Sequence, residues 1–431
     1  MVEMANLWVD LLYNHQTSSV LGILIFLSLV CGFYLVFPFT ISLVSLFLPD
    51  EVKPDSSQES VSDFACIITA YKDIDMAWPL VRSLLAQRYP NFHVYLVADA
   101  VQHPFQQIFD PKFSLLVPPA ALNSKVASLD YALNHLLGTH THVVVFDPDN
   151  LVPDHFLAVI DRYHQAGFAL VQGKRIAKNI DSTYAALDAL GEYYYDYAVR
   201  KAPYLIGSSS TIAGSGMSIQ MDLYKENIAG EMEEFRQKGV VVSEDKSLQL
   251  QMVNRGYRIG YAAAAIIFDE KIRSSEQIGK QRGRWLNSYF RHSIQALGAF
   301  GRGVLRADWN AMLFSVAVLM PPMVVLVGLS FLLMFVGLFV KIAVTLSLLA
   351  ALSTFVVGFL GILLLNRAPR PVLAAIPQIP RFVLGQISGF LNIKRANKDF
   401  MATEHTYKVE IEDVWQARSK EFGYLARWWR K

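Results

Sequence analysis

Three long runs of apolar residues dominate the hydrophobic pattern, and none of them contains a charged residue. They cover residues 19–49, 312–340 and 342–365. A helix needs about 20 apolar residues to cross a hydrocarbon core about 30 Å thick, and each run is long enough. Buried core helices are rarely so long and so free of charge. The pattern therefore predicts about three transmembrane helices, the last two forming a hairpin around Val340 and Lys341.

The first apolar run has a second interpretation, which is a secretory signal peptide. Such a peptide has basic residues before a short apolar stretch and a small-residue cleavage site after it. Residues 1–18 contain no Lys or Arg, the apolar stretch is longer, and no such site follows. We therefore expect a membrane anchor here.

Between residues 64 and 270 the pattern changes to short apolar runs that alternate with amphipathic segments. Residues 64–70, 93–98 and 142–146 are short, β-branched and bounded by polar residues, which favours buried strands. Residues 76–90 and 124–137 have apolar positions at helical spacing. Alternating strands and helices predict an α/β fold whose mostly parallel sheet is covered by helices on both faces.

The charges that flank the apolar runs predict an orientation in the membrane. The N-terminal flank carries Glu3 and Asp10 but no basic residue. By the positive-inside rule, the N-terminus lies outside and residues 52–306 lie in the cytoplasm. We expect an integral protein of the inner, or plasma, membrane. The basic residues that set this orientation are Arg302, Arg306, Arg367 and Arg370.

Overall charge and cysteine content exclude some functions. The net charge of +2 gives no indication of nucleic-acid binding, so we predict no nucleic-acid partner. Cys31 and Cys66 are too few and too far apart for a disulfide framework. This agrees with a domain on a reducing cytoplasmic face.

Polar side chains follow the predicted strands at their carboxyl ends, where ligands bind in parallel sheets. Any one of them alone is also explained as a solvated loop residue. Two aspartates one residue apart after a buried strand, Asp147 and Asp149, suit Mg²⁺ or Mn²⁺, which completes its shell with phosphate oxygens. The other strand-end residues are Thr69, Tyr71, Asp73 and Asp99.

Two later segments also carry candidate chemistry. Glu244 and Asp245 precede a helical run, where Ser243 predicts a helix cap and a carboxylate can also serve as a general base. Residues 280–293 are basic and aromatic, which fits a helix at the membrane interface. The same residues can provide a cation for a diphosphate and an aromatic face for a sugar ring.

These segments together resemble the membrane-integrated branch of family 2 glycosyltransferases, which includes cellulose, chitin, hyaluronan and poly-N-acetylglucosamine synthases. Each motif is weak alone, but their order and spacing are specific, and they cover residues 64–285. The matching stretches are IITAYKD (67–73), SLLAQRYPNF (83–92), LVADA (96–100), NSKVASLDYAL (123–133), DPDN (147–150), AGSGMSI (213–219), SEDKSL (243–248) and Q-x-x-R-W (281–285).

The resemblance implies a GT-A-type (Rossmann-like) catalytic domain and a role for each matching residue. Asp245 is the general base, and Asp147 and Asp149 hold the metal. One base without an enzymic nucleophile implies inversion. At the nucleobase contact, Ala98 stands where the family has a second aspartate, which weakens or shifts that contact. The residues implied to bind the nucleotide-sugar are Thr69, Tyr71, Asp73, Asp99, Lys125, Asp147 and Arg284, and those implied to bind the acceptor are Gly214, Ser215, Gly216, Glu244, Gln281 and Trp285.

The C-terminal region supplies a further hypothesis. Family synthases carry a gating loop of the type F-x-V-T-x-K, and Phe400, Thr403 and His405 match its spacing. Ala402 replaces Val and His405 replaces Lys, so a surface linker is the competing interpretation. Residues 380–395 before it predict an interfacial amphipathic helix.

The predicted organisation has five parts: residues 1–50 with the first transmembrane helix, a GT-A domain at 51–272, interfacial helices at 273–308, a transmembrane hairpin at 309–366 and a C-terminal part at 367–431. Its expected partners are a UDP-sugar, a saccharide or lipid-linked acceptor and the bilayer, with an oligomer left open.

Three functions compete. The first is an inverting glycosyltransferase that makes a β-linked polysaccharide or cell-envelope glycan. The second is a single-transfer enzyme that glycosylates a lipid. The third is a transporter or scaffold without activity, which the absence of charged residues within the apolar runs disfavours.

Overall fold

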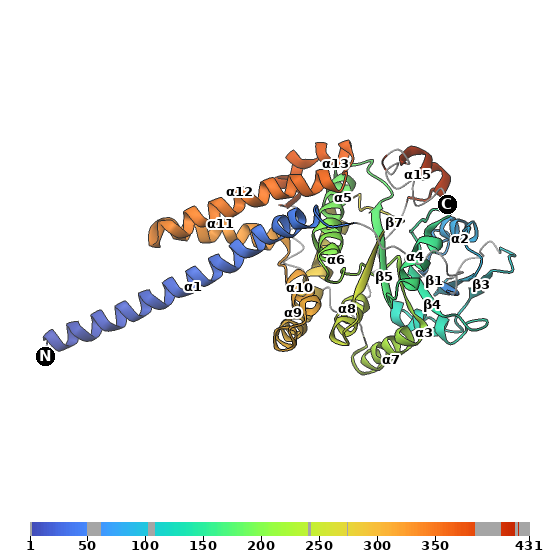
Figure 1. The fold of residues 1–431 in the computed structure, drawn as a ribbon, viewed down its shortest axis with the longest axis horizontal. Helices are drawn as coiled ribbons and strands as arrows, with labels where there is room; N and C mark the ends of the chain where they lie inside the picture. Colours follow the sequence, from blue (N-terminus) through green and yellow to red (C-terminus); the bar gives the residue numbers. More distant parts are fainter. Residues whose placement is uncertain are drawn as a thin grey trace. The chain divides into compact units, whose positions relative to one another are not determined.

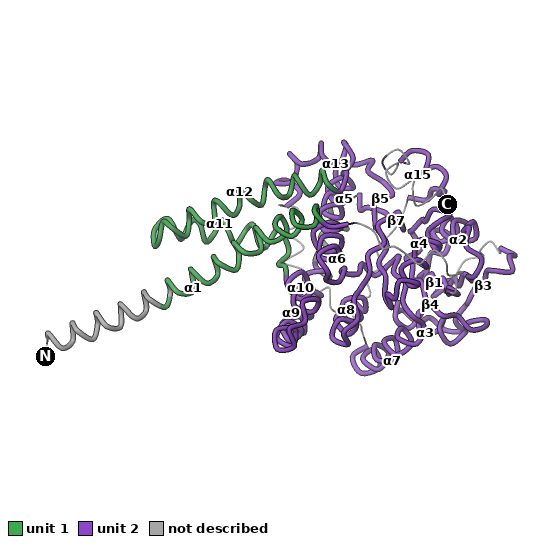
Figure 2. The backbone as a smooth tube through the Cα atoms, viewed as in Figure 1, with its two compact units in different colours: residues 1–47, 320–365 green, residues 48–319, 366–431 purple. Residues whose placement is uncertain are grey.

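A computed structural model describes residues 2–49, 62–101, 108–239, 243–273, 275–383, 407–418 and 421. For residues 2–18, 20, 275–280, 282 and 284 it describes the backbone alone. The chain divides into two compact units, coloured separately in Figure 2. Unit 1 comprises residues 1–47 and 320–365, and unit 2 comprises residues 48–319 and 366–431.

Unit 1 is a bundle of the three predicted apolar helices, α1 (Val2–Ser45), α11 (Met323–Val340) and α12 (Ile342–Leu365). Their segments Leu21–Ser45, Met323–Val340 and Ile342–Leu365 are each long and apolar enough to span a membrane, as predicted. The helices approach closely where side chains are small. A Cβ added at Gly358 would lie 2.7 Å from the Cβ of Phe39, so glycine permits this contact between α12 and α1.

The second apolar run is not one helix, which differs from the prediction. It is interrupted by Pro321 and Pro322, because proline cannot donate the backbone hydrogen bonds of a helix interior. The preceding helix, α10 (Trp309–Val318), belongs to unit 2. Residues 309–319 therefore group with the α/β unit, whereas the sequence pattern placed them in the hairpin.

Unit 2 is built on a seven-stranded sheet with the order β3-β2-β1-β4-β6-β5-β7 (Figure 1). All neighbours pair in parallel except β6, which is antiparallel to β4 and β5. This confirms the mostly parallel α/β prediction. The strands are β1 (Phe64–Tyr71), β2 (Phe92–Asp99), β3 (Phe113–Leu116), β4 (His142–Phe146), β5 (Leu170–Ala177), β6 (Met217–Gln220) and β7 (Ile259–Asp269).

The helices of unit 2 cover the sheet. Alternate residues of β1 and β4, such as Ile67 and Val145, share a core cluster with residues of α3 and α7 to α10. On the other strand positions, Phe146 packs against Phe156 of α4, with ring centroids 5.5 Å apart. The helical elements are α2 (Trp78–Leu85), α3 (Lys125–Leu133), α4 (Phe156–Gln165), α5 (Thr183–Tyr195), η1 (Asp196–Lys201), α6 (Ala202–Leu205), α7 (Met221–Lys238), α8 (Glu244–Asn254), α9 (Ser275–Arg306), α10, α13 (Arg370–Ala374), η2 (Ile376–Gln378) and α15 (Ile411–Arg418).

Local sequence explains where two site helices begin. Ser124 caps α3, since its side chain accepts a hydrogen bond from the Ala127 N–H. The predicted cap at Ser243 is wrong: this residue has φ 64° and its side chain makes no cap hydrogen bond to α8. The acidic start of α8, Glu244 and Asp245, still favours the helix dipole.

Candidate active site

The strand order brings together the residues predicted to bind the nucleotide. β2 lies next to β1 on one side and β4 lies next to it on the other, so the strand order reverses at β1. Ligands of parallel sheets bind at such a topological switch point. Tyr71 at the end of β1 is in register with Asp99 at the end of β2. The Tyr71 hydroxyl donates to Asn123 Oδ1 at 2.9 Å.

Asp99 is buried and binds the backbone of the neighbouring loop. Its side chain is only 2% exposed. Its two carboxylate oxygens accept hydrogen bonds from the backbone N–H groups of Leu122 (2.7 Å) and Asn123 (2.8 Å). Asp99 thus holds the loop that carries Asn123, which has a positive φ of 51°.

The other two predicted residues lie on β1 and just beyond its end. Thr69 is half-buried on β1, whereas Asp73 is exposed beyond the strand and its Oδ1 accepts the Asp75 N–H at 2.9 Å. Asp73 therefore stabilises the turn that leads into α2.

Lys125 contacts residues of both the predicted nucleotide-sugar site and the predicted acceptor site. Its ammonium donates to Asp147 Oδ1 at 2.8 Å and lies 3.4 Å from Glu244 Oε1. It also donates to the Gly214 carbonyl at 3.2 Å. Residues from α3, β4, the loop before β6 and α8 thus meet at one ammonium group.

The charged groups of this cluster shift the pKa values of Lys125 and Glu244. Burial alone would lower the pKa of Lys125, but Asp147 and Glu244 outweigh it and raise that pKa. Burial raises the pKa of Glu244, and the charges of Asp245 and Asp147 raise it further against the opposing effect of Lys125. Lys125 therefore stays charged at neutral pH, and Glu244 takes up a proton more easily than an exposed glutamate does.

Two glycines in the loop before β6 permit close contacts that a side chain would block. A Cβ at Gly214 would lie 3.3 Å from Asp245 Oδ2, and Gly214 has φ +76°. A Cβ at Gly216 would come within 2.4 Å of Ile267, so Gly216 serves packing against β7. Ser215 is fully buried, and its Oγ has no hydrogen-bond partner in the described part of the chain.

The predicted metal pair is divided between two environments. Asp147 has a side chain 32% exposed at the rim, whereas Asp149 is 2% exposed and its Oδ2 accepts the Glu270 N–H at 2.9 Å. The described residues contain no group of three or more His, Cys, Asp or Glu that could hold a metal. A site of two carboxylates still fits Mg²⁺ or Mn²⁺, because phosphate oxygens supply the remaining hard ligands.

The predicted Q-x-x-R-W residues lie on α9. Gln281 Oε1 is buried without a partner among the described residues, and Trp285 is 48% exposed. The side chain of Arg284 lies outside the described part. The gating-loop residues Phe400, Thr403 and His405, and residues 384–395 of the predicted interfacial helix, also lie outside it.

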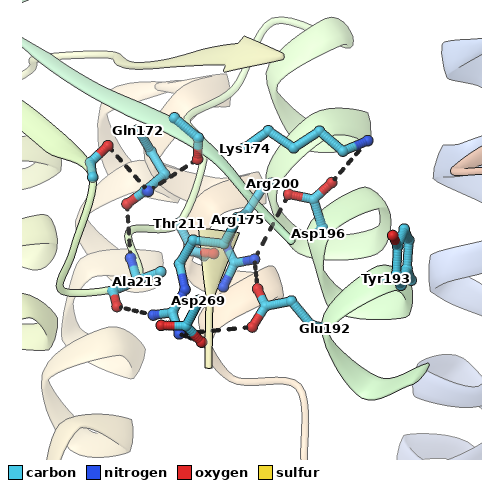
Figure 3. Close-up of polar contacts among 12 residues, drawn as sticks. Gln172, Lys174, Arg175, Glu192, Tyr193, Asp196, Arg200, Thr211, Ala213 and Asp269 are labelled. Carbon is cyan, nitrogen blue, oxygen red and sulfur yellow. Dashed lines mark hydrogen bonds and ion pairs between the residues drawn. The ribbon is translucent and has the colours of Figure 1, made fainter. Parts of the chain in front are cut away.

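A buried ionic network beside the site was missed by the sequence prediction (Figure 3). Arg175 donates to Asp269 at 2.6 Å, and Lys271 lies 2.9 Å from Asp269 and 3.2 Å from Glu192. Arg200 donates to the same Glu192 at 2.6 Å. Burial would raise the pKa of Asp269, but Arg175 and Lys271 outweigh it and hold that pKa at about 2.

The network also holds the loop before β6. Arg175 donates to the Ala213 carbonyl at 2.7 Å, and Gln172 Oε1 accepts the Ala213 N–H at 2.8 Å. Lys174, next to Arg175 on β5, is buried and donates to Asn366 at 2.5 Å, with Asp196 3.7 Å away. The sequence signal that could have indicated this network was the presence of charged residues inside otherwise apolar strand and helix patterns.

Comparisons with known proteins identify the family and agree with the fold described above. The sequence profile described as "Glycosyltransferase like family 2" matches residues 62–288. No curated protein sequence matches the chain. Among solved structures, the mannosyltransferase PcManGT from Pyrobaculum calidifontis, in complex with GDP-Man and Mn²⁺, aligns with a TM-score of 0.50 and 14% identity. That alignment covers 86% of this chain and 98% of that one.

A second similar structure is S. aureus TarS, residues 1–349, with a TM-score of 0.35, 15% identity, and coverage of 78% of this chain and 90% of that one. The same fragment in complex with UDP has a TM-score of 0.37, 14% identity, and coverage of 80% and 94%. At these identities the likeness to PcManGT concerns the fold alone, which is GT-A-like.

Proposed function

The chain belongs to the glycosyltransferase-like family 2, and we propose that it is a membrane-bound inverting enzyme that transfers a sugar from a UDP-sugar to a saccharide hydroxyl. Its product is β-linked and forms part of a polysaccharide or another cell-envelope glycan. The observation that carries this proposal is the Lys125 ammonium, which binds both Asp147 and Glu244, the neighbour of Asp245.

The donor occupies the ends of β1, β2 and β4 in this proposal. Tyr71, Asn123 and Asp99 form the nucleobase side, with Thr69 and Asp73 beside them. Lys125 provides a positive charge where the diphosphate lies, and a fixed cation stabilises the charge that develops on a leaving group. Arg284 adds a second cation.

Asp147 and Asp149 would hold a divalent metal, and the Mn²⁺ in the PcManGT complex makes Mn²⁺ or Mg²⁺ the ion to test. When bound, the metal neutralises charge on the leaving diphosphate. The residues of the chain contribute the anionic ligands and the rigid strand β4 that aims them.

Asp245 is the base of the reaction. It removes the proton from the acceptor hydroxyl while that oxygen attacks the anomeric carbon and the bond to the diphosphate breaks. A single displacement inverts the configuration, so an α-linked donor gives a β-linked product. Glu244, Gln281 and Trp285 contact the acceptor, and Gly214 lets the backbone come close to Asp245.

The remaining sequence predictions complete this proposal. The N-terminus lies outside and unit 2 lies on the cytoplasmic face of the plasma membrane. Phe400, Thr403 and His405 close over the bound nucleotide.

The test is a screen of the purified chain with UDP-glucose, UDP-N-acetylglucosamine, UDP-galactose and UDP-glucuronate, each with Mn²⁺ or Mg²⁺. GDP-mannose is included because PcManGT was solved with GDP-Man. Release of UDP from one donor supports the proposal, and loss of Mn²⁺-dependent UDP binding in Asp147→Ala supports the metal site. Release of nucleotide from GDP-mannose alone would overturn the assignment of a UDP-sugar as the donor.

A lipid acceptor is the second candidate. The exposed apolar residues Phe290, Ile294 and Leu297 lie at helical spacing on α9, the helix that carries Trp285. This surface suits an acceptor held at the membrane interface. Sizing the product decides between the two: one sugar on a lipid rejects the polymer.

A further inference from the structure

The C-terminal segment Tyr407–Arg418 packs across unit 2 and reaches residues on both sides of the proposed donor site. We call this segment the strap. Its helix α15 packs against α2, and Figure 1 shows the two helices next to each other. On α2, Arg82 donates through Nε to Glu410 at 3.1 Å, and its Nη2 makes a second bond to the same carboxylate. The strap is thus attached to the helix that follows β1.

The other end of the strap is anchored near β5 and β7. The Arg418 side chain is buried and donates to the Ala177 carbonyl at the end of β5. It also donates to the Tyr193 hydroxyl at 2.8 Å. Between the two ends, Trp415 contacts His155 and Phe268, with ring centroids 6.0 and 6.3 Å away. Phe268 in turn pairs through a β-bridge with Leu151, just after the D-x-D motif.

A chain of hydrogen bonds connects the strap to Asp149. The Tyr407 N–H donates to Glu270 Oε1 at 3.1 Å, and the Glu270 N–H donates to Asp149 Oδ2 at 2.9 Å. Lys178 donates to the Asp149 carbonyl at 2.7 Å and lies 3.9 Å from Glu270 Oε2. The Tyr407 ring lies 4.6 Å from the Arg273 guanidinium. The position of Asp149 is therefore set by groups that the strap holds.

We infer that Glu270 is a positioning residue that couples the strap to Asp149, so that attachment of the strap sets the affinity of the donor site for a nucleoside diphosphate and its divalent cation. This inference rests on the proposed donor site. The strap joins the two walls of that site, α2 after β1 and the turn after β4. Because coupling is reciprocal, a bound nucleotide must also stabilise attachment of the strap.

The experiment uses the full-length chain in detergent and UDP with Mn²⁺ as the probe. Trypsin cleavage after the exposed Lys408 reports attachment of the strap. Arg82→Glu and Glu410→Arg should each speed this cleavage and weaken UDP–Mn²⁺ binding about two- to fivefold, the size expected for an exposed ion pair. The Arg82→Glu/Glu410→Arg double variant should restore both properties. Bound UDP–Mn²⁺ should slow the cleavage of the wild type.

A matched control pair is available on α7 and directly after α8. Glu226 and Arg255 form a similar exposed pair with two hydrogen bonds, remote in sequence from the strap. Arg255→Glu should change neither cleavage at Lys408 nor UDP binding. At the centre of the coupling, Glu270→Ala should weaken UDP–Mn²⁺ binding, whereas Glu270→Gln keeps the acceptor for Tyr407 and should bind nearly as the wild type does.

The outcomes separate this inference from the proposed function. Faster cleavage at Lys408 with unchanged UDP–Mn²⁺ affinity would overturn the coupling and leave the donor site standing. A wild-type chain that binds no UDP–Mn²⁺ would overturn the donor site and this inference together. Equal weakening by Glu270→Gln and Glu270→Ala would remove Glu270 as the link.

Discussion

Unit 2 contains two groups of charged residues that lie close together but differ in how they are satisfied. In the buried network of Figure 3, each carboxylate has cationic or hydroxyl partners within the protein, as at Asp196, whose oxygens accept the Tyr261 hydroxyl at 2.8 and 2.9 Å. At the carboxyl ends of the strands, Asp147 is partly exposed and forms an ion pair with the Lys125 ammonium. Buried, paired charges support structure, whereas charges left at a rim remain available to a ligand.

The largest effect is expected in the network. Asp196→Ala removes the carboxylate beside Lys174 and the acceptor of the Tyr261 hydroxyl, and it leaves Arg200 with Glu192 alone. Breaking a buried ion pair from one side costs about 3–5 kcal/mol. We expect a large fall in the free energy of unfolding, measured by thermal or denaturant unfolding in detergent. Unfolding like that of the wild type would show that the network is not structural.

A pH titration separates stability from chemistry. Burial lowers the pKa of His142 to about 4 and that of His164 to about 3, and the two rings lie 3.9 Å apart. Below pH 6.5 the unfolded chain takes up protons that the folded chain does not, so stability is complete above pH 6.5 and falls as pH drops toward 4. The expected loss by pH 4 is about 3 kcal/mol for each ring.

This loss of folded protein must be accounted for before a pH–rate profile is assigned to the titration of site residues. His164→Gln should flatten the stability curve between pH 6.5 and 4, since Gln can still bond to Ser218. A curve as steep as that of the wild type would reject His164 as the cause.

A smaller free-energy change is expected for Lys125→Gln at the candidate site. Loss of its charge should raise the KM for the donor about tenfold, which corresponds to about 1.4 kcal/mol. The melting temperature should change little, because Asp147 at the rim is reached by water. Enzyme kinetics and thermal unfolding of the same sample measure both. A large fall in stability with an unchanged KM would place Lys125 with the network instead.

The sequence predicted these two groups unequally. Strands β1, β2 and β4 and their terminal aspartates follow a local pattern of short apolar runs, and the structure confirms those strands. The network and the strap depend on partners far apart in the chain: Arg82 and Glu410 are separated by 328 positions, and Lys174 and Asn366 by 192. Hydrophobic periodicity carries no information about such pairs. The break at Pro321 and Pro322 was visible in the sequence, but the placement of α10 with unit 2 depends on packing.

The most direct test of the account is UDP release by Asp245→Asn, measured beside UDP–Mn²⁺ binding by the same protein. Removing a general base slows a reaction by about 10²–10⁴-fold. We predict a loss in that range with nucleotide affinity and melting temperature unchanged, and a smaller loss for Glu244→Gln. Release by Asp245→Asn at the rate of the wild type would contradict the assignment of the base and of the acceptor side of the site.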